Sequence, residues 1–447
     1  MAVGAFVSLT LPYLWYGQFH SFLGLEVTSS VAFLALFGFR YWRMVVHLAS
    51  YLLYKPAPIP ENPKYTNKDT TVILPTVEPH GDVFRRCCES VCLQNPAAFF
   101  IVVGHKPMLD IAEEVVAPLR MRYPDIDIQV HASLAGKRVQ IAHVLPRIKT
   151  EITFFVDDHV FWGRSFLPCV LAAFEDPHIN LVGTNKAVIV ERRTTWAAAF
   201  WNFLGATYLQ RHNIEIAATT HIDGGIFAVS GRTCAIRSEV LAGEEFRAQY
   251  LNEMFGFLNW TWGPLGADDD NFITRWMVEH GLGIRIQFHP DALIETPLGT
   301  YPKFLATCVR WARTTFRSNP RSLLMKQTWI HQPWSVYGVY IAGLTNFALL
   351  FDPLLVYVFS QTPAYELNWS VWYLMGWIIM TKFLKLIPYF LQNPRDLVLF
   401  PGYVLFAYFH SLIKLFALVT FWDVAWSGRN IEQVSNVGDD TDGENVS

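Results

Sequence analysis

The chain has 447 residues, of which 52% are hydrophobic, 15% aromatic and only 16% charged, and its formal net charge is −3. The length exceeds that of one ordinary domain, the charged share lies well below the usual quarter of a soluble protein, and a slightly negative chain gives no indication of nucleic-acid binding. The hydrophobic excess is concentrated in the first 55 residues and again from about 333 to 426. We therefore expect a soluble α/β domain between two membrane regions.

The N-terminal segment is predicted to remain in the membrane. It lacks the basic segment and the small-residue cleavage site of a signal peptide. Residues 3–39 carry only His20 and Glu26 as potential charges and are long enough for one span or two short ones. The six cysteines have no metal-finger spacing, which favours reduced cytosolic thiols; they stand at positions 87, 88, 92, 169, 234 and 308.

A polar stripe follows this segment, formed by Arg40, Arg43, His47 and Ser50 at helical spacing. The stripe predicts an interfacial helix whose basic groups lie at the lipid headgroups of the cytosolic face. The alternative is a spanning helix whose stripe faces other helices. Residues 56–69 are Pro-rich and polar, which predicts a linker.

Strand-like and helix-like segments alternate from residue 70 to about 287, the pattern of a mostly parallel sheet. Strands are expected at 71–74, 99–103, 126–130, 152–156, 180–190 and 226–229. Helices are expected at 82–94, 109–122, 137–149, 166–174, 196–212 and 269–280. The acidic tail at 431–447 is predicted to be disordered.

Three apolar stretches near the end of the chain are each long enough to cross a bilayer, at about 334–359, 369–390 and 397–422. The loop 361–368 has no Lys or Arg, whereas Lys382, Lys385 and Arg395 flank the next turn. The positive-inside bias therefore places the first loop outside and the second in the cytosol. Asp352 within the apolar run indicates either a functional carboxylate or a helix break near the interface.

The strongest chemical signal is an acidic strand end. The apolar run 152–156 predicts a buried strand, and Asp157, Asp158 and His159 follow it directly. Charges are costly to bury unless they bind something, and ligands of open α/β sheets lie at this end of the strands. Two carboxylates and an imidazole can hold a divalent ion, which can in turn hold a diphosphate. The alternative is a loop in which an aspartate caps the next helix.

Two further segments favour a nucleotide. The strand near residue 74 ends in a Pro-Thr turn, so Thr76 and Glu78 suit the edge of a nucleotide pocket. Gly136, Lys137 and Arg138 open a helix, where backbone N–H groups and two cations would favour a phosphate. The alternative is that the two basic residues are simply solvated.

Three consecutive carboxylates, Asp268, Asp269 and Asp270, begin another predicted helix. They raise one another's pKa unless a cation compensates. The alternative is that acids merely favour the positive end of the helix dipole. One of them, held near a metal-bound sugar phosphate, would be a suitable general base for a sugar hydroxyl.

A basic aromatic run precedes the C-terminal membrane region and contains Arg310, Trp311 and Arg313. It would either contact lipid headgroups or stack an aromatic ring on a sugar and neutralise a diphosphate leaving group.

In this order, the segments resemble those of membrane-integrated family 2 glycosyltransferases of the hyaluronan, cellulose and chitin synthase type, with fungal capsule-type polysaccharide synthases the most similar. The resemblance covers about residues 70–430. The acidic strand end resembles the DxD metal site of the family, with His159 in its third position, and Lys137-Arg138 resembles a GKR element of the UDP pocket.

The remaining motifs follow in the family's order. Ser230, Gly231 and Arg237 match an SG-x5-R segment on the acceptor side. Asp269-Asp270 resembles a GDD element whose second aspartate is the catalytic base. Arg310-Trp311 matches the RW of QxxRW, with Thr307 in place of the glutamine, and residues 426–429 resemble a C-terminal W-G-x-R element. Three full membrane crossings would place that element outside, whereas the family has it in the cytosol.

The resemblance implies a fold and a location. We expect a cytosolic α/β domain of the GT-A type with a mostly parallel sheet at 70–320, inserted between transmembrane helices at 1–55 and 321–430. The protein would be a multi-pass protein of the plasma membrane or the Golgi.

The resemblance also implies a reaction: inverting transfer of a sugar from a UDP-sugar to a growing polysaccharide that passes through the membrane. Mg²⁺ or Mn²⁺ would be held by Asp157 with Asp158 or His159. Asp270 would act as the base, with Asp269 as second choice. Arg310 and Arg313 would hold the departing UDP, and Trp311 would pack near the acceptor sugar. The alternatives are a non-processive enzyme that makes a glycolipid and an inactive transporter or receptor.

Overall fold

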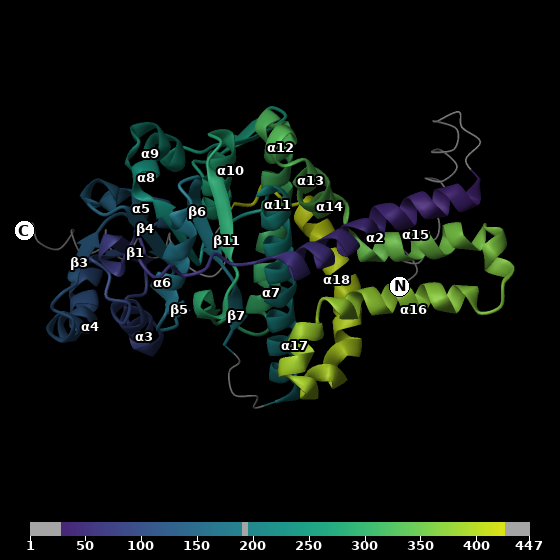
Figure 1. The fold of residues 1–447 in the computed structure, drawn as a ribbon, viewed down its shortest axis with the longest axis horizontal. Helices are drawn as coiled ribbons and strands as arrows, with labels where there is room; N and C mark the ends of the chain where they lie inside the picture. Colours follow the sequence, from purple (N-terminus) through teal and green to yellow (C-terminus); the bar gives the residue numbers. More distant parts are fainter. Residues whose placement is uncertain (1–27, 190–194, 425–447) are drawn as a thin grey trace, which may run out of the picture.

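A seven-stranded sheet lies at the centre of the computed structural model, which describes residues 28–189 and 195–424 (Figure 1). The strand order is β11-β6-β8-β4-β1-β2-β3. Strand β8 runs antiparallel to β4 and β6, and the other pairs are parallel, so the predicted mostly parallel sheet is confirmed. The bounds are β1 Thr70–Thr76, β2 Ala98–Val103, β3 Asp127–Ala132, β4 Ile152–Val156, β6 Ile179–Thr184, β8 Thr233–Arg237 and β11 Gly283–Gln287.

Two smaller sheets accompany it. Strands β5 (Phe161–Trp162), β12 (Ile294–Thr296) and β7 (Lys186–Val188) form one, and β9 (Phe255–Phe257) pairs with β10 (Trp260–Trp262). The strand predicted at 180–190 is therefore divided into β6 and β7, and residue 190 lies outside the described residues.

The strand predicted at 226–229 is wrong. These residues form a loop without strand pairing, and the strand follows at β8. Ile226 and Val229 are only 1% and 2% exposed. The apolar run therefore indicates that the segment is buried, and a buried loop has the same apolar composition as a buried strand. The loop is held in place because the Val229 N–H donates to Thr274 Oγ1 at 2.9 Å.

Helices cover both faces of the main sheet because its strands are apolar on both sides. Along β1, Val72 and Leu74 pack into one core and Ile73 into the other, as the alternation of a strand requires. The helices of this domain are α3 Gly81–Cys92, α4 Met108–Arg122, α5 Lys137–Val144, α6 Phe166–Leu171, α7 Trp196–Asp223, α8 Ser238–Ala242, α9 Glu244–Leu251, α10 Asp269–Glu279, α11 Lys303–Leu324 and α12 Lys326–His331.

Helix α7 continues to Asp223, past the predicted end at His212, and ends at Gly224 with φ +72°. Its second half is rich in β-branched residues, which lowers helix propensity in the sequence. Packing against α2 (Ser29–Leu53) compensates, because α2 and α7 lie side by side.

The polar stripe of α2 faces other helices, as in the alternative interpretation of the sequence. Arg40 pairs with Asp352 at 3.3 Å, and Arg43 donates to the carbonyl of Gly338 at 3.2 Å. Ser50 Oγ donates to a carbonyl of α7 at 2.8 Å, and His47 is buried. The contacts therefore contradict a stripe that lies on lipid headgroups.

The C-terminal apolar stretches are less regular than predicted. The bounds are α13 Pro333–Ser335, α14 Ala342–Thr345, α15 Ala348–Ser360, α16 Ser370–Leu384, α17 Ile387–Gln392 and α18 Phe400–Leu418. The chain bends by 97° between Pro333–Thr345 and Ala348–Ser360. Among the described residues, Ser29–Leu53 and Pro394–Leu418 are long and apolar enough to cross a membrane, and the bent pair would be a third span. Helix α16 has 15 residues, about 22 Å, which is shorter than a typical hydrocarbon core.

Asp352 lies inside α15 and not at the bend, so it does not mark the helix break. It is 4% exposed and pairs with both Arg40 and Lys382, the latter at 2.5 Å. The carboxylate thus joins α2, α15 and α16.

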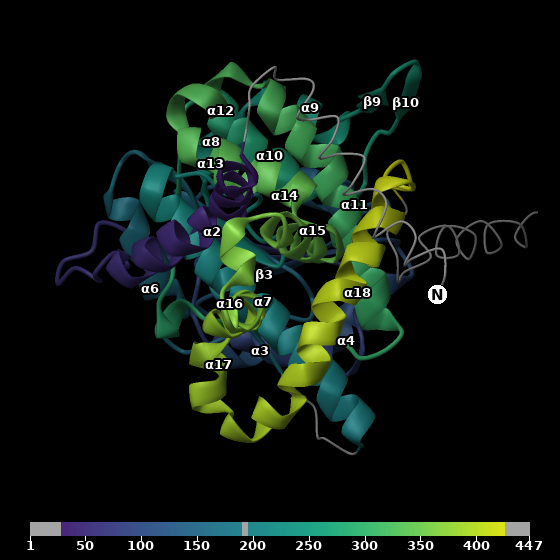
Figure 2. The same cartoon turned by 90° about the vertical axis from the view of Figure 1, so that its right-hand side faces the viewer.

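These three helices extend together away from the α/β domain, whereas α18 runs across them beside α11 (Figures 1 and 2). At the far end, Ser29 Oγ donates to the carbonyl of Gln361 at 2.6 Å. Nearer the α/β domain, Arg317 of α11 is bonded to the segment that follows α18: its Nη1 donates to the carbonyls of Phe421 and Asp423 at 2.8 and 3.0 Å. The end of α18 is therefore fixed to α11, while the predicted W-G-x-R element at 426–429 lies outside the described residues.

Candidate active site

The two acidic segments meet on Lys137, the first residue of α5. Its Nζ lies 2.9 Å from Asp157 Oδ1, directly after β4, and 3.1 Å from Asp269 Oδ2, at the start of α10. The same Nζ donates to the carbonyl of Gly231 at 2.6 Å. Segments more than a hundred positions apart in the chain therefore form one ionic cluster at the carboxyl edge of the sheet.

The charges in this cluster compensate one another. Burial lowers the pKa of Lys137, but the carboxylates of Asp157 and Asp269 outweigh it and hold that pKa well above its usual range. Burial also raises the pKa of Asp157, and Lys137 outweighs it, so that this carboxyl has a lowered pKa. Both groups are therefore charged at neutral pH.

Asp270 has the opposite tendency. Burial and then the neighbouring Asp269 raise its pKa, and Lys137 only partly opposes them. Its Oδ2 accepts a hydrogen bond from the Gly231 N–H at 3.1 Å. A fixed carboxyl group with a raised pKa is suited to accept a proton during a reaction.

Gly231 lets the backbone approach these charged groups. A Cβ at this position would lie 3.2 Å from Lys137 Nζ, 3.3 Å from Asp270 Oδ2 and 3.5 Å from Asp269 Oδ1. Lys137 Nζ and Asp270 Oδ2 would each have to shift by a few tenths of an ångström, whereas 3.5 Å to Asp269 is an ordinary contact.

We expect Gly231→Ala to lower turnover by about 10- to 100-fold, because small displacements of reacting groups are costly. Steady-state kinetics of the purified protein measures this loss. Gly266→Ala is the matched control, because a Cβ there meets nothing within 4 Å. Equal turnover of both variants would contradict the assigned role of Gly231.

The predicted metal ligands do not all point into the cluster. Asp158 is 5% exposed and accepts a hydrogen bond from Thr76 Oγ1 at 2.7 Å, and its Oδ1 lies 3.0 Å from His159 Nδ1. In the described part of the chain, no three His, Cys, Asp or Glu side chains are arranged to hold a metal ion. The donor set of Asp157, His159 and Asp158 still suits Mg²⁺ or Mn²⁺, because such ions take few protein ligands and complete their coordination with substrate phosphates and water. Glu78 lies beside this group, with its N–H donating to Thr76 Oγ1 at 3.0 Å.

Aromatic and basic side chains border the cluster on the side of α11. Trp311 stacks on Tyr208 of α7 with ring centroids 5.1 Å apart, and the guanidinium of Arg232 lies 5.4 Å from the Trp311 ring. Burial and then the nearby charge of Arg310 lower the pKa of Arg232, while Asp157 raises it. The structure thus brings Arg310 and Trp311 to the cluster.

Sequence reasoning missed Arg232, Tyr208 and Lys186. Arg232 lies inside the SG-x5-R segment, between Ser230 and the arginine that the motif specifies. Its place within this motif is the sequence feature that could have indicated a role for Arg232. The Ser230 hydroxyl accepts from the Arg232 N–H at 3.3 Å and shapes this turn.

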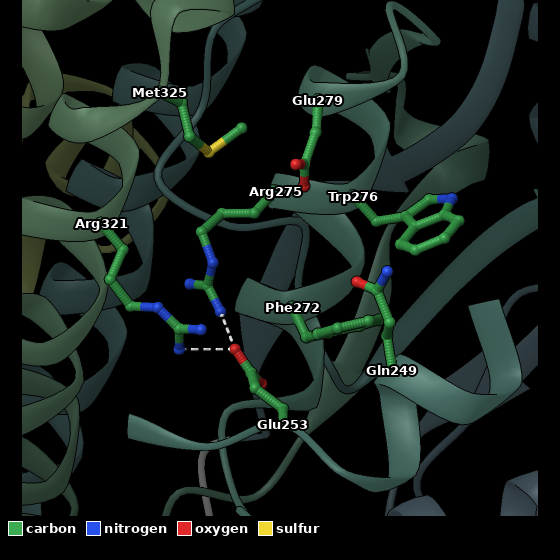
Figure 3. Close-up of a pocket in the computed structure, with 8 residues that line it drawn as sticks. All are labelled: Gln249, Glu253, Phe272, Arg275, Trp276, Glu279, Arg321 and Met325. Atoms are coloured by element: carbon green, nitrogen blue, oxygen red, sulfur yellow. Dashed lines mark hydrogen bonds and ion pairs between the residues drawn. The ribbon is translucent and has the colours of Figure 1, made fainter. Parts of the chain in front are cut away.

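Arg138 points away from the cluster. Its side chain is 2% exposed and pairs with Glu253 at 2.7 Å. Glu253 also accepts from Arg275 and Arg321 at 2.5 and 2.6 Å. Arg275, Arg321 and Glu253 line a pocket of about 180 Å³ along α10 (Figure 3). None of the predicted site residues lines this pocket, and Arg138 reaches it only through its contact with Glu253. We therefore remove Arg138 from the candidate site.

Arg237 and Arg313 are also occupied elsewhere. Arg237 ends β8 opposite Ile152, at the other edge of the sheet from Asp157, and donates to Tyr65 and to backbone carbonyls. Arg313 pairs with Asp423 at 2.5 Å, beyond the end of α18. The substrate roles predicted for these two residues have no support in their contacts, and we remove both from the site.

The sheet order, the acidic strand end and the paired carboxylates at the start of α10 define a glycosyltransferase domain of the GT-A class. The chain belongs to family 2 of the glycosyltransferases: the family described as "Glycosyltransferase like family 2" matches residues 68–314. The chain is 39% identical to a "Type 2 glycosyltransferase" of Gibberella zeae over 408 residues, which covers 89% of this chain and 75% of that protein. A "Type 2 glycosyltransferase" of Pyricularia oryzae is 38% identical over 404 residues, covering 89% and 82%.

A solved structure has the same fold. It is the mannosyltransferase PcManGT from Pyrobaculum calidifontis in complex with GDP-Man and Mn²⁺, with a TM-score of 0.51, 16% identity, and coverage of 86% of this chain and 97% of that one. The GT-A-type fold predicted from the sequence is thereby confirmed.

Proposed function

We propose that this glycosyltransferase is a processive, inverting hexosyltransferase that moves a sugar from a UDP-sugar to a growing polysaccharide and passes the polymer across the membrane. The observation that carries the proposal is the cluster in which Lys137 joins Asp157 to the carboxylates of α10. It is supported by the described helices that are long and apolar enough to cross a membrane.

In this reaction the acceptor hydroxyl attacks the anomeric carbon of the donor sugar. A new carbon–oxygen bond forms, the bond from the anomeric carbon to the diphosphate breaks, and UDP leaves. Asp270 takes the hydroxyl proton, with Asp269 as the second choice. Lys137 and Arg310 attract the diphosphate, Thr76 and Glu78 border the nucleotide, and the Trp311–Tyr208 stack offers an apolar face to the acceptor sugar.

A divalent ion, Mg²⁺ or Mn²⁺, would be held by Asp157 with His159 or Asp158 and would neutralise the charge of the departing diphosphate. The solved mannosyltransferase of the same fold is in complex with GDP-Man and Mn²⁺, which supports this choice.

We expect excess EDTA to abolish transfer and added Mn²⁺ or Mg²⁺ to restore it, because the charge on the leaving group would otherwise remain uncompensated. Nucleotide release from the purified protein measures both steps. Full activity in EDTA would argue against the metal site.

The membrane arrangement that we propose is multi-pass, in the plasma membrane or the Golgi, with the catalytic domain of residues 70–320 in the cytosol. Helices α2, α15 and α16 would cross the bilayer, and α18 would lie along its surface beside α11. The short lengths of α15 and α16 would require a locally thinner bilayer.

We expect Glu366→Cys and Arg395→Cys to react with a membrane-impermeant maleimide from opposite sides of a sealed membrane. Both positions are exposed, and the six native cysteines are buried, so background labelling is low. Reaction of both from the same side would contradict this arrangement.

A donor screen tests the function as a whole. UDP-glucose, UDP-N-acetylglucosamine, UDP-glucuronate and GDP-mannose are offered to the purified protein, and nucleotide release is measured. A gel then separates a polymer from a lipid that carries one sugar. Single additions would favour the glycolipid alternative, and no turnover of any donor would favour an inactive transporter or receptor.

A further inference from the structure

A buried lysine lies beside the candidate active site. Lys186 begins β7, just after β6, and is 4% exposed. Its Nζ lies 3.3 Å from His212 Nδ1 of α7. Among the described residues, 28–189 and 195–424, no carboxylate lies within ion-pair distance of Lys186.

The position of Lys186 follows from the strand order. Strands β1, β4, β8 and β6 are neighbours in this order, so the residues after β6 lie on the far side of Gly231 from Thr76 and Asp157. The nucleotide is assigned to the side of β1 and β4. Lys186 therefore lies on the acceptor side of Asp270.

A second cation lies on the same side. Burial and then the charge of Arg232 lower the pKa of Lys186 to about 7, and Asp270 opposes them. Arg232 carries a buried Nε that has no hydrogen-bond partner. A buried lysine next to an arginine whose buried Nε is unpaired is costly unless an anion binds both groups.

Basic groups continue from here toward the membrane helices. One turn along α7 from His212, Glu215 pairs with Lys385 at 2.6 Å. The charges of Arg43 and Arg211 also act on Glu215. Three cations around one carboxylate leave an excess of positive charge along the route from Lys186 to the membrane helices.

We propose that Lys186 and Arg232 bind an oxyanion of the acceptor, a carboxylate or a phosphate, next to the hydroxyl that Asp270 deprotonates. The acceptor is then an acidic sugar chain or a phosphate-linked sugar, because a neutral acceptor would offer the two side chains no anion beyond the carboxylates of Asp157 and Asp270. This inference rests on the proposed glycosyltransfer, because that reaction defines which side of Asp270 receives the acceptor.

Reductive methylation of Lys186 tests it without turnover. The full-length protein is kept in detergent with Mn²⁺ and UDP, so that the donor side is occupied, and treated with formaldehyde and cyanoborohydride. Inorganic phosphate, glucuronate or glucose is added, and mass spectrometry measures methylation of Lys186 relative to the exposed Lys326. We expect phosphate or glucuronate, at about ten times its dissociation constant, to lower methylation of Lys186 about tenfold, and glucose to leave it unchanged. The anion that protects at the lower concentration identifies the phosphate or the carboxylate source.

Arg232→Gln should remove most of the protection, whereas Arg247→Gln, at an exposed position of α9, should leave it intact. Equal protection by glucose, no protection by either anion, or a Lys186 that the reagent never reaches would each overturn the inference. Donor turnover is measured on the same preparation of the native protein. If neither anion protects Lys186 in a native protein that turns over its donor, this inference alone is overturned and the proposed function stands.

Discussion

Asp270→Asn should lower turnover by about 10²- to 10⁴-fold, the usual contribution of a general base. The amide has the same shape as the carboxylate and its oxygen still accepts the hydrogen bond of the Gly231 N–H, which is 3.1 Å long in the native protein. It does not take a proton from the acceptor hydroxyl. The lower turnover should therefore reflect a slower sugar-transfer step and not weaker binding of the donor.

The measurement combines steady-state turnover with calorimetric binding of UDP. We expect the affinity for UDP to stay close to that of the native protein, because Asp157 and Lys137 are unchanged. Asp269→Asn is the matched control, since Asp269 contacts Lys137 at 3.1 Å and not the Gly231 N–H. Retained turnover in Asp270→Asn together with its loss in Asp269→Asn would transfer the base role to Asp269.

The same variant pair has a pH signature. A base works only when deprotonated, and burial followed by the charge of Asp269 raises the pKa of Asp270. Turnover of the native protein should therefore fall as the pH drops through this raised pKa, above the range of about 3.9 in which an exposed aspartate titrates. The acid limb should disappear from the residual activity of Asp270→Asn.

The sequence predicted the centre of this site because burial and charge occur together there. The apolar run of β4 ends in carboxylates, and such a pattern has few purposes other than ligand binding at a sheet edge. Pattern alone does not give side-chain direction. Successive residues of a helix point about 100° apart, so Lys137 reaches the carboxylates while the adjacent Arg138 reaches Glu253.

The same limit explains the membrane region. The sequence shows that α2 has a polar face that avoids lipid, but not what this face contacts. The ion pair between Arg40 and Asp352 shows that it contacts another helix of the protein. Hydropathy likewise detects the apolar stretch of α18 without its direction, which its packing against α11 determines. Lys186 gave no signal at all, because its place depends on the break between β6 and β7 and on the course of α7.

The second large effect concerns Lys137. Its side chain is 10% exposed and bonds to Asp157, Asp269 and the Gly231 carbonyl. Lys137→Met leaves buried carboxylates without their cation, which should lower the free energy of unfolding by about 3–5 kcal/mol. It also removes a cation next to the departing diphosphate, so that turnover per folded molecule should fall by about 10²- to 10³-fold.

Arg138→Met is the matched control, because Arg138 is the next residue of α5 and is still more buried than Lys137, with its charge paired to Glu253. We expect a similar loss of stability, measured by denaturant unfolding in detergent, but turnover per folded molecule within a few-fold of the native protein. Two variants with equal stability loss and different turnover separate a group that stabilises the domain from one that also acts on the substrate. If Arg138→Met lost turnover as completely as Lys137→Met, the second cation would belong to the phosphate site after all, and the direction of its side chain would have to change when the nucleotide binds.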